Sequence, residues 1–242
     1  MIKKIKEKSE ILTLVKKNGL VLQNASKKLR ADREVVLEAV RQNGVALFYA
    51  SHELQGDREV VLEAIRQYGG ALQYASEELR ADREVVMQAV KQYGYALEYA
   101  SKMWQNNRGV VLEAVKQEGG ALQYASYEIR NCYELRGDKE IILEAVRQTG
   151  WALQYASKEF RADKEVVLEA VMQNGLALQF ASEELRADRE VVLEAIRQYG
   201  GALKFASGEL QADWEVVMLA VKQNKKALKY ASEELLIKLL TN

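Results

Sequence analysis

The stretch that decides the fold is Asp57-Arg-Glu-Val-Val-Leu-Glu-Ala-Ile-Arg-Gln-Tyr-Gly69, which recurs as Asp188-Arg-Glu-Val-Val-Leu-Glu-Ala-Ile-Arg-Gln-Tyr-Gly200. Related copies follow one another every 25 residues, with a single spacing of 31. They begin at Asp32, Asp57, Asp82, Asn107, Asp138, Asp163, Asp188 and Asp213. A second motif, Ala-Leu-x-x-Ala-Ser, runs in the same phase, and a degenerate copy, Val21-Leu-Gln-Asn-Ala-Ser26, precedes the eight. A fixed period of roughly 20–50 residues is typical of stacked repeats.

The first half of each repeat predicts an amphipathic helix. An Asp such as Asp32 is expected at its N-cap, where the carboxylate accepts from amides of the first turn. The residues from Val35 to Val40 give a broad apolar face, and charged residues form a narrow stripe. Gly44 and its equivalents follow, and we expect them to end the helix in the left-handed conformation that glycine adopts easily.

The second half predicts a shorter helix, because Ala71, Leu72, Ala75 and Leu79 share one helical face. One two-helix unit of this size cannot bury its apolar face alone, so stacking is required. The sequence therefore predicts an all-α protein, an α-solenoid of about eight 25-residue two-helix repeats. We expect one continuous domain over residues 1–242. It comprises an N-terminal cap with the degenerate repeat (1–31), the eight repeats (32–232) and a C-terminal capping helix (233–242).

The long spacing marks a six-residue insertion near 127–136, where Tyr127-Glu-Ile-Arg130 is followed by the similar Tyr133-Glu-Leu-Arg136. One interpretation is a protruding element on a binding side. The other, which we favour, is a tolerated insertion that extends one short helix and its turn.

Composition narrows the function classes further. The 242 residues include no proline, which suits short helices joined by repeated turns. The single cysteine, Cys132, excludes a disulfide framework within the chain, and the single histidine, His52, argues against a histidine-rich metal site or a catalytic triad. We expect Cys132 to be a lone thiol and His52 to lie on the surface. No enzyme activity, cofactor or metal is expected.

The spacing Leu-x-x-Ala-Ser-x-x-Leu-x-x-Asp-x-Glu-Val-Val-x-x-Ala-Val-x-x-x-Gly resembles a family of short helical repeats known only as domain of unknown function 4116. The resemblance runs from about Glu7 to Leu235 and weakens at Asn107-Arg-Gly109 and at Lys225, which replaces the glycine. It implies the helical-repeat fold and assigns no activity. The short period is also similar in architecture to leucine-rich variant repeats, in which α and 3₁₀ helices alternate. This similarity implies a second helix that is partly 3₁₀.

Variable positions of the second helix predict a recognition face, because solenoids commonly bind along such a surface. From this face we select Phe48, Tyr95, Tyr127 and Trp151 as candidate partner-binding residues. Beside them runs a nearly constant aromatic column, which we interpret mainly as packing with the hydroxyl groups at the rim. Its members are Tyr49, Tyr74, Tyr99, Tyr124, Tyr155, Phe180, Phe205 and Tyr230.

Two polar positions recur in every repeat. The glutamines equivalent to Gln42 are expected to hydrogen-bond neighbouring repeats near helix C-termini. The serines equivalent to Ser51 are expected either to bond back to a carbonyl one turn earlier or to pack as small residues.

These observations predict a non-enzymatic interaction scaffold that binds a protein or peptide along the variable face. One alternative is a nucleic-acid-binding repeat, since residues 1–30 carry nine Lys/Arg against two acids. Because the whole chain has a formal net charge of +0, we consider nucleic acid the weaker alternative. A third possibility is a consensus-like or engineered repeat protein without a natural ligand. We expect a cytoplasmic protein with no membrane segment, monomeric apart from weak self-association through its C-terminal tail.

Overall fold

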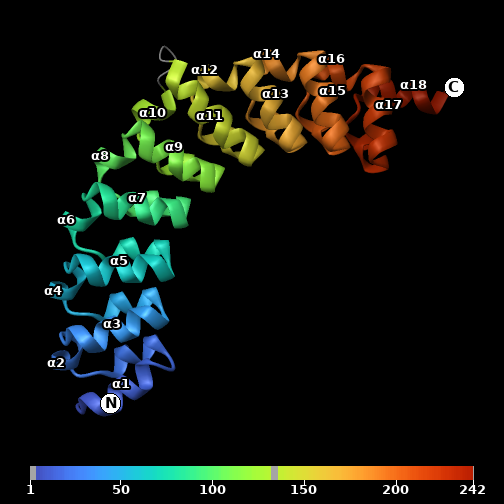
Figure 1. The fold of residues 1–242 in the computed structure, drawn as a ribbon. Coiled ribbons are helices and arrows are strands. Elements are labelled where there is room, and N and C mark those ends of the chain that lie inside the picture. Colours follow the sequence, from blue (N-terminus) through green and yellow to red (C-terminus); the bar gives the residue numbers. More distant parts are fainter. Residues whose placement is uncertain (1–3, 132–135, 242) are drawn as a thin grey trace. The chain divides into compact units, whose positions relative to one another are not determined.

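The computed structural model describes residues 4–131 and 136–241 of the chain (Figure 1). The described residues form α- and 3₁₀-helices and one isolated parallel bridge, between Ile5 and Ala25. The chain divides into two compact units, unit 1 (Met1–Ser126) and unit 2 (Tyr127–Asn242). One continuous domain over 1–242 stays a prediction, and each unit is described by itself below.

Each repeat has three parts, a long α-helix, a six-residue 3₁₀-helix and a short α-helix. The long helices are α1 (Lys8–Val15), α3 (Arg33–Gln42), α5 (Arg58–Gln67), α7 (Arg83–Gln92), α9 (Arg108–Gln117), α11 (Arg136–Gln148), α13 (Lys164–Gln173), α15 (Arg189–Gln198) and α17 (Trp214–Gln223). The 3₁₀-helices are η1 (Gly19–Asn24), η2 (Gly44–Tyr49), η3 (Gly69–Tyr74), η4 (Gly94–Tyr99), η5 (Gly119–Tyr124), η6 (Gly150–Tyr155), η7 (Gly175–Phe180), η8 (Gly200–Phe205) and η9 (Lys225–Tyr230). The short helices are α2 (Lys27–Arg30), α4 (His52–Gln55), α6 (Glu77–Arg80), α8 (Lys102–Gln105), α10 (Tyr127–Asn131), α12 (Lys158–Arg161), α14 (Glu183–Arg186) and α16 (Gly208–Gln211), followed by the C-terminal helix α18 (Glu233–Thr241).

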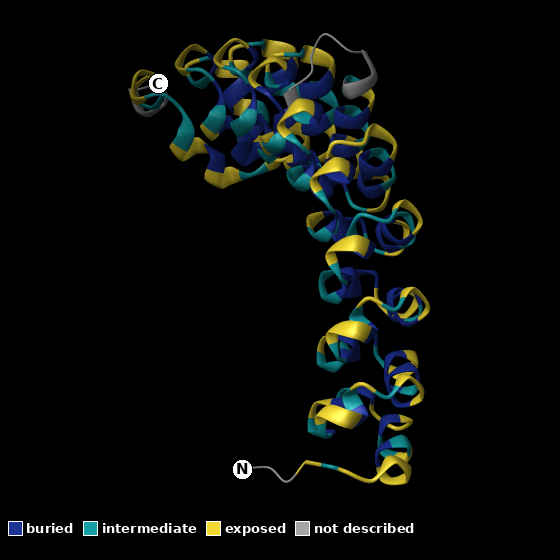
Figure 2. Ribbon diagram, turned by 90° about the vertical axis from the view of Figure 1, so that its left-hand side faces the viewer, coloured by how far each residue is buried: buried dark blue, intermediate teal, exposed yellow. Residues whose placement is uncertain are grey.

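The all-α repeat fold is confirmed, and so is the expectation of 3₁₀ structure in the second half of the repeat. Within each unit, the long helices of adjacent repeats pack on one another. A 3₁₀-helix such as η2 packs on the long helix of its own repeat, on the long helix of the next repeat and on the 3₁₀-helices of adjacent repeats. The degenerate N-terminal copy forms the same three parts as the other repeats. The core lies between the layers and consists of aliphatic residues such as Val36, Val40 and Leu47, all fully buried. Figure 2 shows buried and exposed residues on different sides of the same helices.

The predicted N-caps are confirmed at seven of the eight repeat starts. Each carboxylate or Asn107 side chain accepts from the amide three residues on, as Asp32 does from Val35 at 3.2 Å. The exception is Asp138. Helix α11 begins at Arg136, so Asp138 lies inside the first turn instead of before it. The insertion therefore lengthens mainly the long helix and adds one residue to the short one; Cys132 itself lies outside the described residues.

The prediction of left-handed glycines is wrong. No described residue, glycine or other, has a positive φ, and the long helices end in an extended residue such as Asn43 (φ −156°, ψ 113°). Glycine is needed for close approach instead. A Cβ on Gly69 would lie 2.7 Å from the carbonyl oxygen of Ala89 in the next long helix. The same overlap would arise between Gly44 and the Ala64 carbonyl.

At most described repeats the serine forms an N-cap instead of the predicted bond to a carbonyl one turn earlier, while packing as a small residue fits Ser101, whose buried hydroxyl caps no helix. The Ser hydroxyl caps the short helix, as Ser51 Oγ does by accepting from the Leu54 amide at 3.4 Å. The glutamine prediction is confirmed at several positions. Gln173 Oε1 accepts from the Gly150 amide at 2.8 Å, and Gln223 Oε1 accepts from the Gly200 amide at 2.7 Å.

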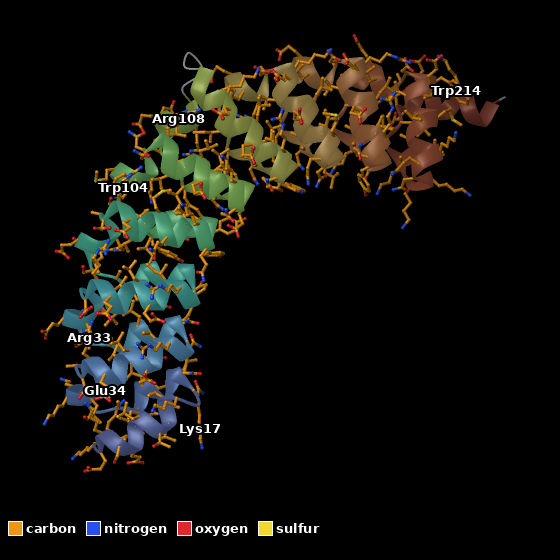
Figure 3. All side chains as sticks on the ribbon, viewed as in Figure 1. Lys17, Arg33, Glu34, Trp104, Arg108 and Trp214 are labelled. Carbon is orange, nitrogen blue, oxygen red and sulfur yellow. The ribbon has the colours of Figure 1, made fainter. Side chains whose placement is uncertain are left out.

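Ion pairs between successive long helices were not foreseen from the sequence. In several repeats the basic residue after the N-cap reaches the N-cap Asp of the next repeat and the Glu two positions beyond it. Lys164, for example, lies 2.8 Å from Asp188 and 2.7 Å from Glu190. Arg33, labelled with Glu34 in Figure 3, bonds Asp57 in the same way at 2.9 Å. The signal available in the sequence was a base and an acid at separations of 24 and 26 residues, about one repeat apart.

Candidate functional site

The candidate site is an aromatic surface on the outer side of the 3₁₀-helices of unit 1. A 3₁₀-helix has three residues per turn, so its second and fifth residues point the same way. In η2 these are Val45 and Phe48, while Ala46 and Leu47 between them are fully buried. In η4 they are Tyr95 and Glu98. The register of the repeat thus places one pair of side chains per repeat on a common outer face.

Aromatic rings from successive repeats touch along this surface. Phe48 contacts Tyr49 and Tyr74, with centroids 5.0 and 5.3 Å apart. A second group, called the tyrosine cluster below, comprises Tyr68, Tyr93, Tyr95 and Tyr124. Its successive centroid distances are 5.8, 5.6 and 6.2 Å, and the last pair is edge-to-face at 88°. These separations suit favourable ring–ring contacts, so the cluster is a preformed surface spanning three successive repeats.

Glycines make room for these rings. A Cβ on Gly70 would overlap the Tyr68 ring, and a Cβ on Gly120 would overlap the Tyr95 hydroxyl of the preceding repeat. The second glycine of each Gly-Gly pair is therefore linked to an aromatic neighbour, as Gly201 is to Tyr199 in unit 2.

Two carboxylates adjoin the tyrosine cluster. Glu98 is exposed, and Glu118 Oε2 accepts from the Gly94 amide. Partial burial of the Tyr124 hydroxyl, together with its hydrogen bond to Glu98 and the charge of that group, raises the pKa of Tyr124 to about 12. Burial and the charge of Glu118 likewise raise the pKa of Tyr93. The electrostatic environment of the cluster is thus negative.

The 3₁₀-helices of unit 2 also carry aromatic rings, but their neighbours include a tryptophan and two lysines. Trp151 contacts Phe180 at a centroid distance of 5.4 Å. In the last two repeats a lysine covers its neighbouring ring, with Lys204 Nζ 5.5 Å from the Phe205 centroid and Lys229 Nζ 4.9 Å from that of Tyr230.

The four predicted partner-binding residues are placed as follows. Tyr127, Phe48 and Trp151 are 70%, 57% and 38% exposed, whereas Tyr95 is half-buried among other tyrosines. Phe48 and Tyr95 belong to two different ring groups of unit 1, and Tyr127 and Trp151 belong to unit 2. The structure therefore does not bring the four into one contact group.

Sequence reasoning missed Tyr68 and Tyr93, which occupy the extended residue before each 3₁₀-helix. The available signal was an aromatic residue directly before Gly-Gly at Tyr68 and Tyr199. The constant Tyr column is half-buried, in keeping with rings that pack at the rim. His52 is exposed, and its Nδ1 lies 3.1 Å from Gln55 Oε1.

Metal-binding and membrane-spanning features differ from the aromatic surface in what they require of the chain. Across residues 4–131 and 136–241, no group of three or more His, Cys, Asp or Glu side chains is placed to hold a metal ion. None of the described helices is long and apolar enough to cross a membrane. A shallow crevice of about 460 Å³ lies beside Glu98, between α6 and α8, with Arg80, Tyr99, Ser101 and Lys102 among its lining residues.

Comparison with protein families matches four segments of the chain, residues 9–55, 57–105, 138–186 and 188–236, to the family described as "Domain of unknown function (DUF4116)". Each match spans two of the 25-residue repeats, and the repeat that begins at Asn107 falls between matches. A search of curated proteins finds no match. Since the matched segments cover well over half of the residues, the chain belongs to the DUF4116 family.

Proposed function

We propose that the chain is a non-enzymatic interaction scaffold that binds a protein or peptide segment along the outer side of the 3₁₀-helices in unit 1. The observation that carries the proposal is the presence of two groups of touching, partly exposed rings in unit 1, one around Phe48 and one from Tyr68 to Tyr124. Tyrosine is enriched among residues that anchor interfaces, because it offers a large rigid apolar surface with a polar end.

Packing alone accounts for only part of this surface. The residues that hold the repeats together, such as Leu47 and Ala46, are fully buried. Phe48 in the same 3₁₀-helix leaves 57% of its surface in solvent, although a phenylalanine gains stability only from the area that it buries. The variable outer positions are therefore free to serve recognition while the constant inner positions maintain the stack.

Selection of ligands from a random-peptide display library tests the proposal. The test variant carries Phe48→Ala and Tyr95→Ala together, and the matched control carries Met103→Ala, a 60% exposed apolar side chain on the short helix α8. We expect selected peptides to bind wild type and control equally and to bind the test variant at least about tenfold more weakly. A double change of Tyr127 and Trp151 to Ala examines unit 2 in the same assay.

Circular dichroism shows whether each variant keeps its helices. Peptides that bind the Phe48/Tyr95 variant as tightly as wild type would refute the proposal, as would a selection that yields no binding peptide.

A further inference from the structure

We infer that the tyrosine cluster, together with Glu98 and Glu118, takes up the cationic side chain of a lysine- or arginine-containing segment of the partner. This inference rests on the proposed function and specifies the chemistry of the ligand. Aromatic faces with nearby carboxylates attract ammonium and guanidinium groups, because the ring quadrupole and the negative charge act in the same direction.

The geometry brings both elements to one place. Tyr95 and Glu98 are second and fifth in the same 3₁₀-helix, so they share its outer face. Tyr95 meets the rings of Tyr93 and Tyr124 on either side. No described cation forms an ion pair with Glu98 or Glu118 (the one bond given above for Glu118 is to a backbone amide). Glu98 also accepts a hydrogen bond from the neutral Tyr124 hydroxyl, so the charges of both carboxylates are not neutralised by these bonds and attract a cation from outside.

Two rings of the constant aromatic column already contact a lysine ammonium group of the chain itself. In the repeats of Phe205 and Tyr230, the residue before the ring is a lysine, and its ammonium group lies over that ring. In η4 the equivalent residue is Glu98, before Tyr99. Phe205 and Tyr230 of unit 2 are thus each preceded by a lysine, whereas the equivalent Tyr99 of unit 1 is preceded by the oppositely charged Glu98.

Neighbouring bases do not cancel this charge. Arg80 and Lys102 line the same crevice as Glu98, but neither forms an ion pair with it. Arg80 lies 4.0 Å from Glu77, and Lys102 Nζ lies 3.1 Å from Gln105 Oε1. Burial is the largest cause of the raised pKa values of Tyr93, Tyr99 and Tyr124, and the charge of Glu98 or Glu118 contributes to each of them, which agrees with negative charge near the rings.

The test compares two synthetic peptides that differ only in charge, a Gly/Ser peptide with spaced lysines and the same peptide with norleucine in their place. Binding is measured by chemical-shift changes of the tyrosine rings. We expect the lysine peptide to bind at least about fivefold more tightly than the norleucine peptide, as a few exposed cation–π and charge contacts allow. Raising the salt concentration should weaken only the lysine peptide.

The charge variants are Glu98→Gln and Glu118→Gln, and the matched control is Glu53→Gln, an exposed glutamate on α4. Each cluster variant should weaken lysine-peptide binding by about threefold, with the control unchanged. Equal binding of the two peptides, or equal effects of the cluster and control variants, would overturn the inference.

Peptides from the display selection separate this inference from the proposed function. If they require Phe48 and Tyr95 but show no enrichment in Lys or Arg, the proposed function stands and the cationic ligand is wrong. A single-stranded oligonucleotide that stacks on Tyr95 and binds more tightly to Glu98→Gln would also overturn the inference, because it would show a negatively charged ligand.

Discussion

Replacement of Gly69 by alanine measures how closely the repeats approach one another. The added Cβ would lie 2.7 Å from the Ala89 carbonyl oxygen, and an ordinary C···O contact is about 3.3 Å. The Ala89 oxygen cannot swing away, because it accepts the Tyr93 amide at 2.9 Å. Forcing the backbones apart costs about 1–3 kcal/mol, and the lower entropy of the unfolded chain returns about 0.4–1 kcal/mol. Taking the middle of each range, we expect Gly69→Ala to lower the free energy of unfolding by about 1.3 kcal/mol.

Gly56→Ala is the matched control in the same unit. Gly56 has φ −97°, its nearest neighbour to an added Cβ is 3.4 Å away, and other repeats carry alanine there, as at Ala81. Alanine should therefore stabilise the protein by about 0.4–1 kcal/mol at this position. Urea denaturation followed by far-UV circular dichroism compares both variants with wild type.

A change at Lys225 distinguishes the two explanations for the recurring glycine, close packing against the next long helix and a left-handed turn. Lys225 replaces the glycine in the last repeat, where no described long helix follows. If glycine were needed for a left-handed turn, Lys225→Gly would relieve strain and raise the denaturation midpoint. Close packing predicts no gain. A stabilised Lys225→Gly, or a Gly69→Ala protein as stable as wild type, would refute the packing argument.

Three further predictions concern single side chains. Trp104→Phe should cost about 1 kcal/mol in urea denaturation, because the indole donates a hydrogen bond of 2.7 Å to the Ala81 carbonyl of the preceding repeat. Lys164 holds the pKa of Asp188 below its ordinary value by hydrogen bonding, so this contribution to stability is present above about pH 4 and is lost as the pH falls through the folded pKa. Lys164→Met should flatten this part of the acid denaturation profile. Tyr124 stabilises the folded state fully below its unfolded pKa of about 10 and loses that effect as the pH rises through about 12. Ultraviolet titration should lack this late tyrosine in Tyr124→Phe, and should show it at lower pH in Glu98→Gln.

The repeat boundaries and the N-caps could be predicted from the sequence because they depend on local rules. An Asp before an apolar helix has one common function, and Asp32 performs it. The 3₁₀ structure of the second half followed from a resemblance in period. Asp138 departed from its predicted position because the insertion let α11 begin one turn earlier.

A residue that recurs in every repeat is harder to interpret when two different structural requirements would each explain it. Gly69 recurs in phase whether a turn or a neighbouring backbone demands it, and only the contact with the next repeat decides between them. The site was partly hidden for a similar reason. Tyr93 and Tyr95 come together because Tyr93 is an extended residue directly before η4, and the helical period does not encode that geometry.

The contact between successive repeats is directional, and this has a consequence for assembly. One side offers a glycine and a basic residue, and the other side offers an alanine carbonyl and two acids, as in the pairing of Lys164 with Asp188 and Glu190. A head-to-tail interface of this kind does not close on itself, so exposed copies at both ends would join molecules into fibres. The last repeat changes both groups on its outgoing side, with Trp214 in the basic position (Figure 3) and Lys225 in place of glycine. With neither group present, this repeat offers no matching surface for the Asp, Glu and alanine carbonyl of a further long helix, so a head-to-tail contact of this type is not favoured at its outgoing side.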